Sequence, residues 1–222
     1  MYIKNITMAI SRKILAQNIV LVTNGLNVNS FSQYWFIKNG IFAEEDFLGG
    51  SVFTPGLTLV SSQDCQLTVL PNQIQLELKS DIPEMALQSV QNRMVKLIKC
   101  LTNVKVIAIG INFIWKLNDN EKDITVLSKS LFGESNVNIG SYFNKADTRY
   151  GAYYSQNIDQ QTRLKLDIKP SMVKENGQNV DFMMYNFNFH SDVPERQMEE
   201  TVLDQVNKWQ QFYKLTNDLI CL

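Results

Sequence analysis

Apolar and polar residues alternate with a period of two along several stretches of the chain, the pattern of a strand that buries one face. The longest stretch covers residues 104–117, where large apolar side chains occupy every second position from Ile107 to Trp115. At about 3.3 Å per residue, a strand of this length spans roughly 40 Å. We therefore expect it to be central in a sheet.

A strand pattern followed by a helix-start motif and an apolar stripe at helical spacing occurs twice. The two motifs are Ser80-Asp81-Ile82-Pro83-Glu84 and Ser191-Asp192-Val193-Pro194-Glu195. In each, Ser or Asp can cap a first turn, Pro needs no hydrogen-bond partner there, and Glu suits the positive end of the helix dipole. The repetition predicts that the chain is duplicated, and that one long helix follows each motif.

The predicted elements come in the same order in both parts of the chain. We expect an α+β fold of two tandem related halves, residues 1–103 and 104–222, each β-α-β(3-4)-α, which either form separate domains or share one core. This order resembles the TATA-binding-protein-like topology, which is often duplicated into a saddle. The resemblance carries no functional residue across. It implies mainly antiparallel sheets with helices packed on one face, the other face being left for solvent, a ligand or the other half.

The net charge and the cysteine spacing of the sequence argue against several functional classes. The 222 residues include 21 basic and 22 acidic side chains spread along the chain, so the formal net charge is −1 and no basic stripe marks a nucleic-acid or membrane surface. The three cysteines lack metal or redox spacing, and the sequence contains neither a signal-peptide core nor an apolar run of membrane length. We expect a reduced, cytoplasmic protein without membrane association.

The sequence contains few of the residues and motifs that enzymes use for catalysis. His190 is its one histidine, and nucleotide-binding loops and His or Cys pairs with ligand spacing are missing. Ser191 and Asp192 follow His190, but neighbours along a strand point to opposite faces. We therefore expect no catalytic residue, no metal and no cofactor, and leave open a metal-independent ribonuclease that uses His190.

Amide, basic and tyrosine side chains follow the polar positions of the strands in the second half. The candidate binding residues are Asn112, Arg149, Tyr150, Tyr154, Arg163, Lys165, Asn186, Asn188 and His190. If these faces coincide, they suit a protein strand, a peptide or single-stranded nucleic acid, with tyrosines as anchors. The alternative is an ordinary solvated sheet face.

The function that this sequence favours is a non-enzymatic binding or assembly module of the cytosol. Its partner would be another protein or a second copy of the chain. A nucleic-acid binding protein, chiefly for RNA, or a ribonuclease that uses residues 149–169 is the alternative.

Overall fold

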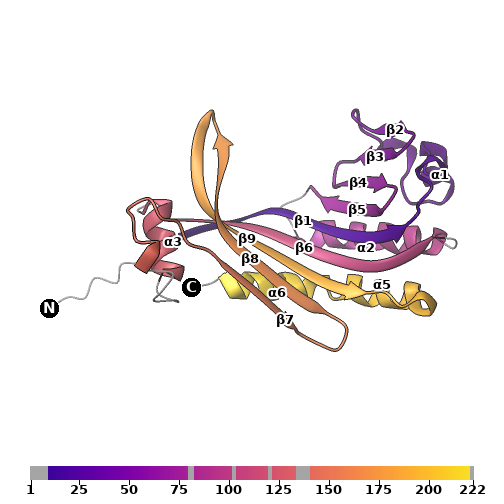
Figure 1. Cartoon of the computed structure of the whole chain (residues 1–222). Helices are drawn as coiled ribbons and strands as arrows, with labels where there is room; N and C mark the ends of the chain where they lie inside the picture. Colours follow the sequence, from indigo (N-terminus) through magenta and orange to yellow (C-terminus); the bar gives the residue numbers. More distant parts are fainter. Residues whose placement is uncertain (1–9, 80–82, 102–103, 120–121, 134–140, 221–222) are drawn as a thin grey trace. The chain divides into compact units, whose positions relative to one another are not determined.

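The computed structural model describes residues 10–79, 83–101, 104–119, 122–133 and 141–220, and for residues 83–86 it describes the backbone alone (Figure 1). The chain has an α+β fold with a large antiparallel sheet and helices, as the sequence predicts. Within the described residues, every helix is too short or too polar to cross a bilayer.

The strands and helices account for most of the described chain. The strands are β1 Ile10–Asn24, β2 Val52–Thr54, β3 Leu57–Ser61, β4 Cys65–Leu70, β5 Gln73–Leu78, β6 Lys105–Asp119, β7 Ala152–Asn157, β8 Arg163–Glu175 and β9 Gln178–Asp192. The helices are η1 Val28–Ser30, α1 Gln33–Lys38, η2 Glu44–Asp46, α2 Pro83–Cys100, α3 Ile124–Phe132, η3 Glu195–Gln197, α5 Met198–Asn207 and α6 Trp209–Ile220. The hydrogen-bonded strand order is β2-β3-β4-β5-β1-β6-β9-β8-β7.

Two compact units divide the chain, and several of the long strands contribute to both. Unit 1 takes Met1–Leu15, Ile114–Ser155 and Lys165–Phe187, and unit 2 takes Ala16–Phe113, Gln156–Leu164 and Asn188–Leu222. Each unit is described below by itself.

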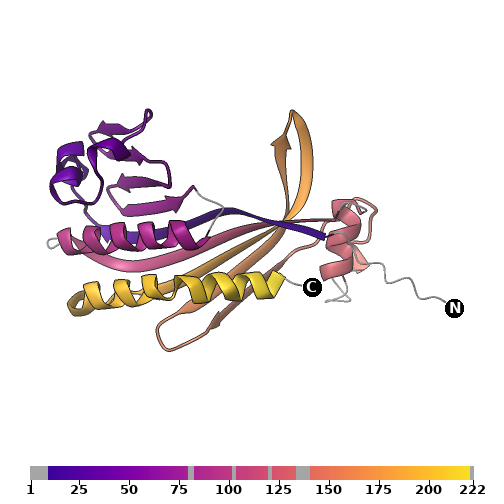
Figure 2. The same cartoon turned by 180° about the vertical axis from the view of Figure 1, so that it is seen from behind.

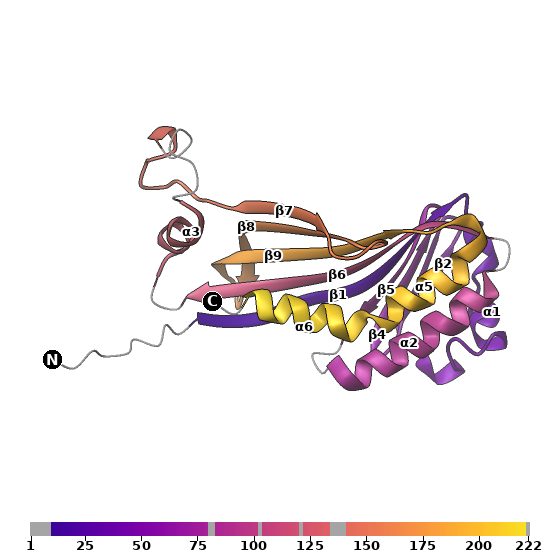
Figure 3. The same cartoon turned by 90° about the horizontal axis from the view of Figure 1, so that it is seen from below.

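The core of unit 2 lies between one face of its strands and the helices α2, α5 and α6; α2 lies beside α5, and α6 continues from the end of α5 (Figures 2 and 3). Every second residue of β3, β4 and β5 is buried, which is the alternation that the sequence shows. At the centre of the core, the Phe113 ring of β6 contacts Trp209 and Phe189, and Phe189 stacks on Phe212 of α6. The aromatic residues of the C-terminal helices therefore seal the sheet on this side.

Unit 1 contains α3 and the hairpin of β8 and β9. Asn176 and Gly177 form the tip of this hairpin with positive φ angles of 51° and 81°, as expected for an Asn-Gly turn. Lys116 of β6 is 7% exposed, and its ammonium lies 2.5 Å from Glu175 and 5.4 Å from the centre of the Phe182 ring. Glu175, on the hairpin of β8 and β9, thus neutralises the charge of this buried lysine.

The second helix-start motif does not act as the sequence predicts. β9 continues through Ser191 and Asp192, and the Val193 amide donates to the Ile107 carbonyl at 2.9 Å, so pairing with β6 replaces the cap. A 3-10 turn covers Glu195–Gln197, and the α-helix begins only at Met198. It breaks at Lys208 into α5 and α6 instead of forming one long helix. In the first motif, Ser80 to Ile82 lie outside the described residues, and α2 begins at Pro83.

Candidate binding surface

The sheet face of unit 2 opposite the helices carries half-buried side chains. Antiparallel pairing places Ser61 opposite Gln66, Gln66 opposite Glu77, and Glu77 opposite Asn18. Directly opposed residues point to the same face of a sheet, so these four polar side chains form one row across β3, β4, β5 and β1. The row runs perpendicular to the strands.

Two further asparagines extend this row across β6 and β9. The Asn112 amide donates from Nδ2 to Asn18 Oδ1 at 2.7 Å, and Asn188 Nδ2 donates to Asn112 Oδ1 at 2.6 Å. We call the six side chains the polar row: Ser61, Gln66, Glu77, Asn18, Asn112 and Asn188. A carboxamide has two N–H groups and an oxygen that accepts twice, so each amide keeps bonding capacity for a further partner.

A glycine on β6 makes room for the asparagines of the polar row. A Cβ atom at Gly110 would lie 3.2 Å from Nδ2 of Asn188 and 3.9 Å from Nδ2 of Asn112. The first of these distances is tighter than an ordinary van der Waals contact, so a larger residue would displace the Asn188 amide. The glycine therefore leaves room for the hydrogen-bonded amides of Asn188 and Asn112.

One row of side chains beside the polar row is uncharged. The neighbouring row consists of Leu59, Thr68, Gln75 and Val20, placed opposite one another by the same register. Gln75 donates a hydrogen bond from Nε2 to the Glu77 carboxylate at 3.3 Å, and the Lys79 ammonium donates to Ser61 Oγ at 2.6 Å. Burying such a face costs less than burying one lined by free ions.

Four of the predicted binding residues lie in unit 2, and two of them belong to the polar row. Asn112 and Asn188 are joined directly, as described above. His190, two residues further along β9, has Nε2 3.2 Å from Asp192 Oδ1. The Arg163 guanidinium donates to Asn157 Oδ1 at 3.2 Å.

The other predicted binding residues lie in unit 1 and are partly engaged there. Arg149 forms an ion pair with Asp181 at 3.0 Å, and the backbone amide of Tyr150 donates to Ser128 Oγ at 3.2 Å. Lys165 and Asn186 are half-buried on β8 and β9. Arg149 therefore offers less free positive charge than the sequence suggests.

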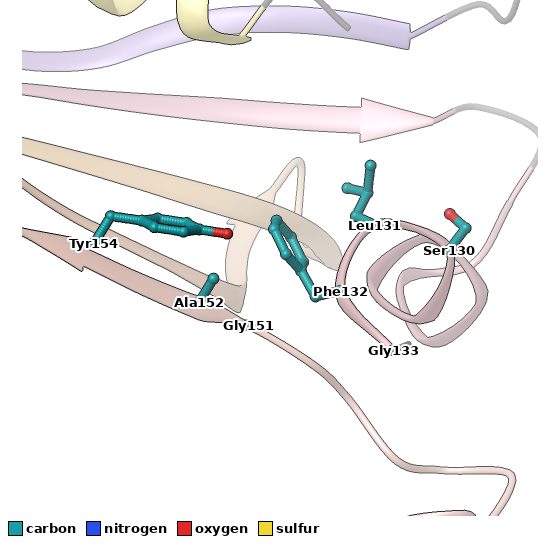
Figure 4. A pocket seen from close by; sticks show the side chains of 7 residues that line it. All are labelled: Ser130, Leu131, Phe132, Gly133, Gly151, Ala152 and Tyr154. Carbon is teal, nitrogen blue, oxygen red and sulfur yellow. The ribbon is translucent and has the colours of Figure 1, made fainter. Parts of the chain in front are cut away.

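Tyr154 lines a pocket of about 400 Å³ in unit 1, between the end of α3 and the start of β7. Figure 4 shows its ring extending from β7 toward the Phe132 ring of α3. Gly151 and Gly133 contribute backbone to the wall, and an added Cβ at Gly151 would lie 2.3 Å from the Ile168 carbonyl oxygen. The pocket thus depends on a close approach of β7 to β8.

A charged cluster on the helix-covered side of unit 2 is not evident from the sequence. Arg93 of α2 donates to both carboxylate oxygens of Asp64, at 2.6 and 2.5 Å, and lies 3.5 Å from Asp46. Its guanidinium also lies 4.8 Å from the centre of the Phe42 ring. These residues are far apart in sequence, so only the packing of α2 brings them together.

The cluster changes the proton affinity of its members. Burial alone would raise the pKa of Asp64, but hydrogen bonds from Ser89, Arg93 and Ser62 and the charge of Arg93 outweigh it and hold this pKa well below its ordinary 3.8. Burial raises the pKa of the neighbouring Cys65 thiol to about 11. Cys65 is therefore protonated at neutral pH and is a poor nucleophile.

Comparison with known protein families finds no family model that matches the chain, and no curated protein matches it. Within the described residues, no group of three or more His, Cys, Asp and Glu side chains is arranged to hold a metal ion.

Proposed function

We propose that this protein is a non-enzymatic binding module, and that the polar row is its contact surface for an extended segment of a partner protein. The observation that carries the proposal is the hydrogen-bonded chain from Asn188 through Asn112 to Asn18 on a sheet face that the helices of unit 2 leave uncovered. Amides that are fixed before binding lose little conformational entropy when a partner docks, which favours affinity.

Charge favours a polypeptide over a nucleic acid as the partner. Nucleic-acid affinity comes largely from cations that neutralise phosphates. The polar row contains one carboxylate, Glu77, and the nearby Lys79 is engaged by Ser61 and by the Ser62 carbonyl. Peptide groups instead present alternating N–H donors and carbonyl acceptors, which amide side chains match.

A peptide selection tests this proposal. Peptides selected from a random library on the full chain are titrated against the wild type, Asn112→Ala and the control Asn207→Ala, which changes an exposed asparagine at the end of α5. Loss of the central amide should weaken binding about tenfold, the equivalent of one hydrogen-bonding group. The control should bind like the wild type.

Equal affinities of Asn112→Ala and the wild type would reject the polar row as the contact surface. The alternative function, binding of nucleic acid, has less support from the polar row, whose asparagine amides supply no cation for phosphate. Salt-sensitive binding of RNA that is lost in Asn112→Ala, without binding of selected peptides, would establish this alternative.

We further propose that the chain consists of two tandem related halves, residues 1–103 and 104–222. The strand order supports this, because the first half reads β1-β5-β4-β3-β2 outward from the centre and the second reads β6-β9-β8-β7. In both halves the last strand lies beside the first. The free thiols of Cys65 and Cys100 support the proposal of a cytoplasmic location.

A further inference from the structure

The polar row carries one formal charge, the carboxylate of Glu77. The strand register places Glu77 between Gln66 of β4 and Asn18 of β1, so it lies inside the row and not at its end. The residue is half-buried. A carboxylate in such a position has lost part of its water shell, and an opposite charge therefore stabilises it more than it would at a fully exposed site.

Glu77 has no ion-pair partner within the part of the chain that the structure describes. Its carboxylate accepts a hydrogen bond from Nε2 of Gln75, a neutral donor, at 3.3 Å. Lys79 lies on the same face of β5, but its ammonium donates to Ser61 Oγ of β3 at 2.6 Å and to the Ser62 carbonyl at 3.0 Å. In the strand order, β3 and β1 lie on opposite sides of β5, so the Lys79 ammonium is directed away from the asparagines.

The acceptor capacity of Glu77 is largely unused by the described contacts. A carboxylate has about four lone-pair sites, and the hydrogen bond from Gln75 uses one of them. Asp64, a partly buried carboxylate on the helix-covered side, differs because Arg93 donates to both of its oxygens. Glu77 therefore suits a cation that arrives with a partner.

We propose that Glu77 makes the polar row selective for a partner segment that contains a lysine or an arginine, whose cation binds the Glu77 carboxylate. This inference rests on the proposed function, and it names the chemistry of the segment that the polar row selects. Hydrogen bonds between opposite charges are roughly twice as strong as those between neutral groups. A segment with a neutral or acidic residue at this point would bury the carboxylate without compensation, so it would bind more weakly.

The strand order also sets the position of the basic residue within the segment. From β5, which carries Glu77, the sheet continues through β1 and β6 to β9, which carries Asn188. Neighbouring strands lie about 4.8 Å apart, so the path from β5 to β9 covers about 14 Å, and an extended chain rises about 3.3 Å per residue. A segment along the polar row therefore needs about four residues beyond the lysine or arginine to reach Asn188.

Titration of selected peptides against a Glu77 variant tests this selectivity. Peptides selected from a random library on the full chain should share a lysine or arginine, and replacing it by methionine should weaken binding to the wild type about tenfold. Glu77→Gln keeps the size of the side chain and removes its charge, so it should bind the parent peptide and the methionine peptide equally. The control Glu199→Gln changes an exposed glutamate of α5 and should keep the preference of the wild type.

Failure of this inference is distinct from failure of the proposed function. If Asn112→Ala weakens binding but the selected peptides share no basic residue, or Glu77→Gln keeps the full preference, the polar row binds peptides and Glu77 does not select them. Equal affinity of the wild type for the two peptides would also overturn the inference, and this comparison needs no protein variant. If Asn112→Ala binds like the wild type, the polar row itself is rejected, and the role of Glu77 with it.

Discussion

Arg93 shows how a single residue ties distant parts of unit 2 together. From α2 it binds Asp64, in the turn before β4, and reaches Asp46 of η2, while its own side chain is only 13% exposed. Removing one partner of a buried ion pair leaves an uncompensated charge in the interior, which destabilises the folded state. The ion pairs of Arg93 therefore join α2 to the turn before β4 and to η2.

Removing the arginine should lower stability in a pH-dependent way. Because the pKa of Asp64 is depressed in the folded state, its contribution is present above the unfolded value near 4 and is lost as the pH falls toward the folded value. We expect Arg93→Met to reduce the free energy of unfolding by about 2 kcal/mol at pH 7. Urea unfolding should show a smaller difference from the wild type at pH 3.

The matched control for this experiment is Arg196→Met, which changes an exposed arginine of η3. It should alter the free energy of unfolding by less than about 0.5 kcal/mol. A cost of Arg93→Met that is the same at pH 7 and pH 3 would mean that packing of the side chain, and not its ion pair, stabilises α2.

The sequence predicts which residues of a single strand lie on its polar face, but it does not predict which polar residues of different strands contact one another. Asn112 and Asn188 stand at polar positions of alternating strands, so the sequence marks them as face residues. Asn18 is missed because its own strand is dominated by a β-branched apolar run. The link between the three depends on the order β1, β6 and β9, which brings together residues far apart in the chain.

At the scale of elements, local signals were reliable where no long-range pairing competed with them. The hairpin of β4 and β5 and the Asn176-Gly177 turn follow directly from turn residues and alternation. The helix-start motif at Ser191 fails because β9 continues through Ser191 and Asp192, and the Val193 amide then donates to the Ile107 carbonyl of β6. Ser191 is buried there, where its hydroxyl lies 3.4 Å from Thr162 Oγ1.

At the scale of the whole molecule, unit 2 draws on both proposed halves. Asn18 of the first half binds Asn112 of the second, and Gln91 of α2 donates to the Val206 carbonyl of α5 at 3.3 Å. A cut between residues 103 and 104 would separate these partners. The two halves can therefore be related by duplication and still share a core.

Separate expression of residues 1–103 and 104–222 should yield two pieces that do not unfold cooperatively. Each piece would lose the contacts between α2 and α5 and the bond between Asn18 and Asn112. Co-expression should restore one cooperative transition, measured by circular dichroism during urea unfolding. Cooperative unfolding of both isolated pieces would instead mean that the halves are independent domains.

The most direct test of the binding surface is an NMR titration of the full chain, labelled with ¹⁵N at asparagine side chains, with a selected peptide. The amide signals of Asn18, Asn112 and Asn188 should shift together, and those of Asn207 should stay in place. Binding that leaves these three amides unchanged while it shifts other signals would contradict the assignment of the polar row as the contact surface.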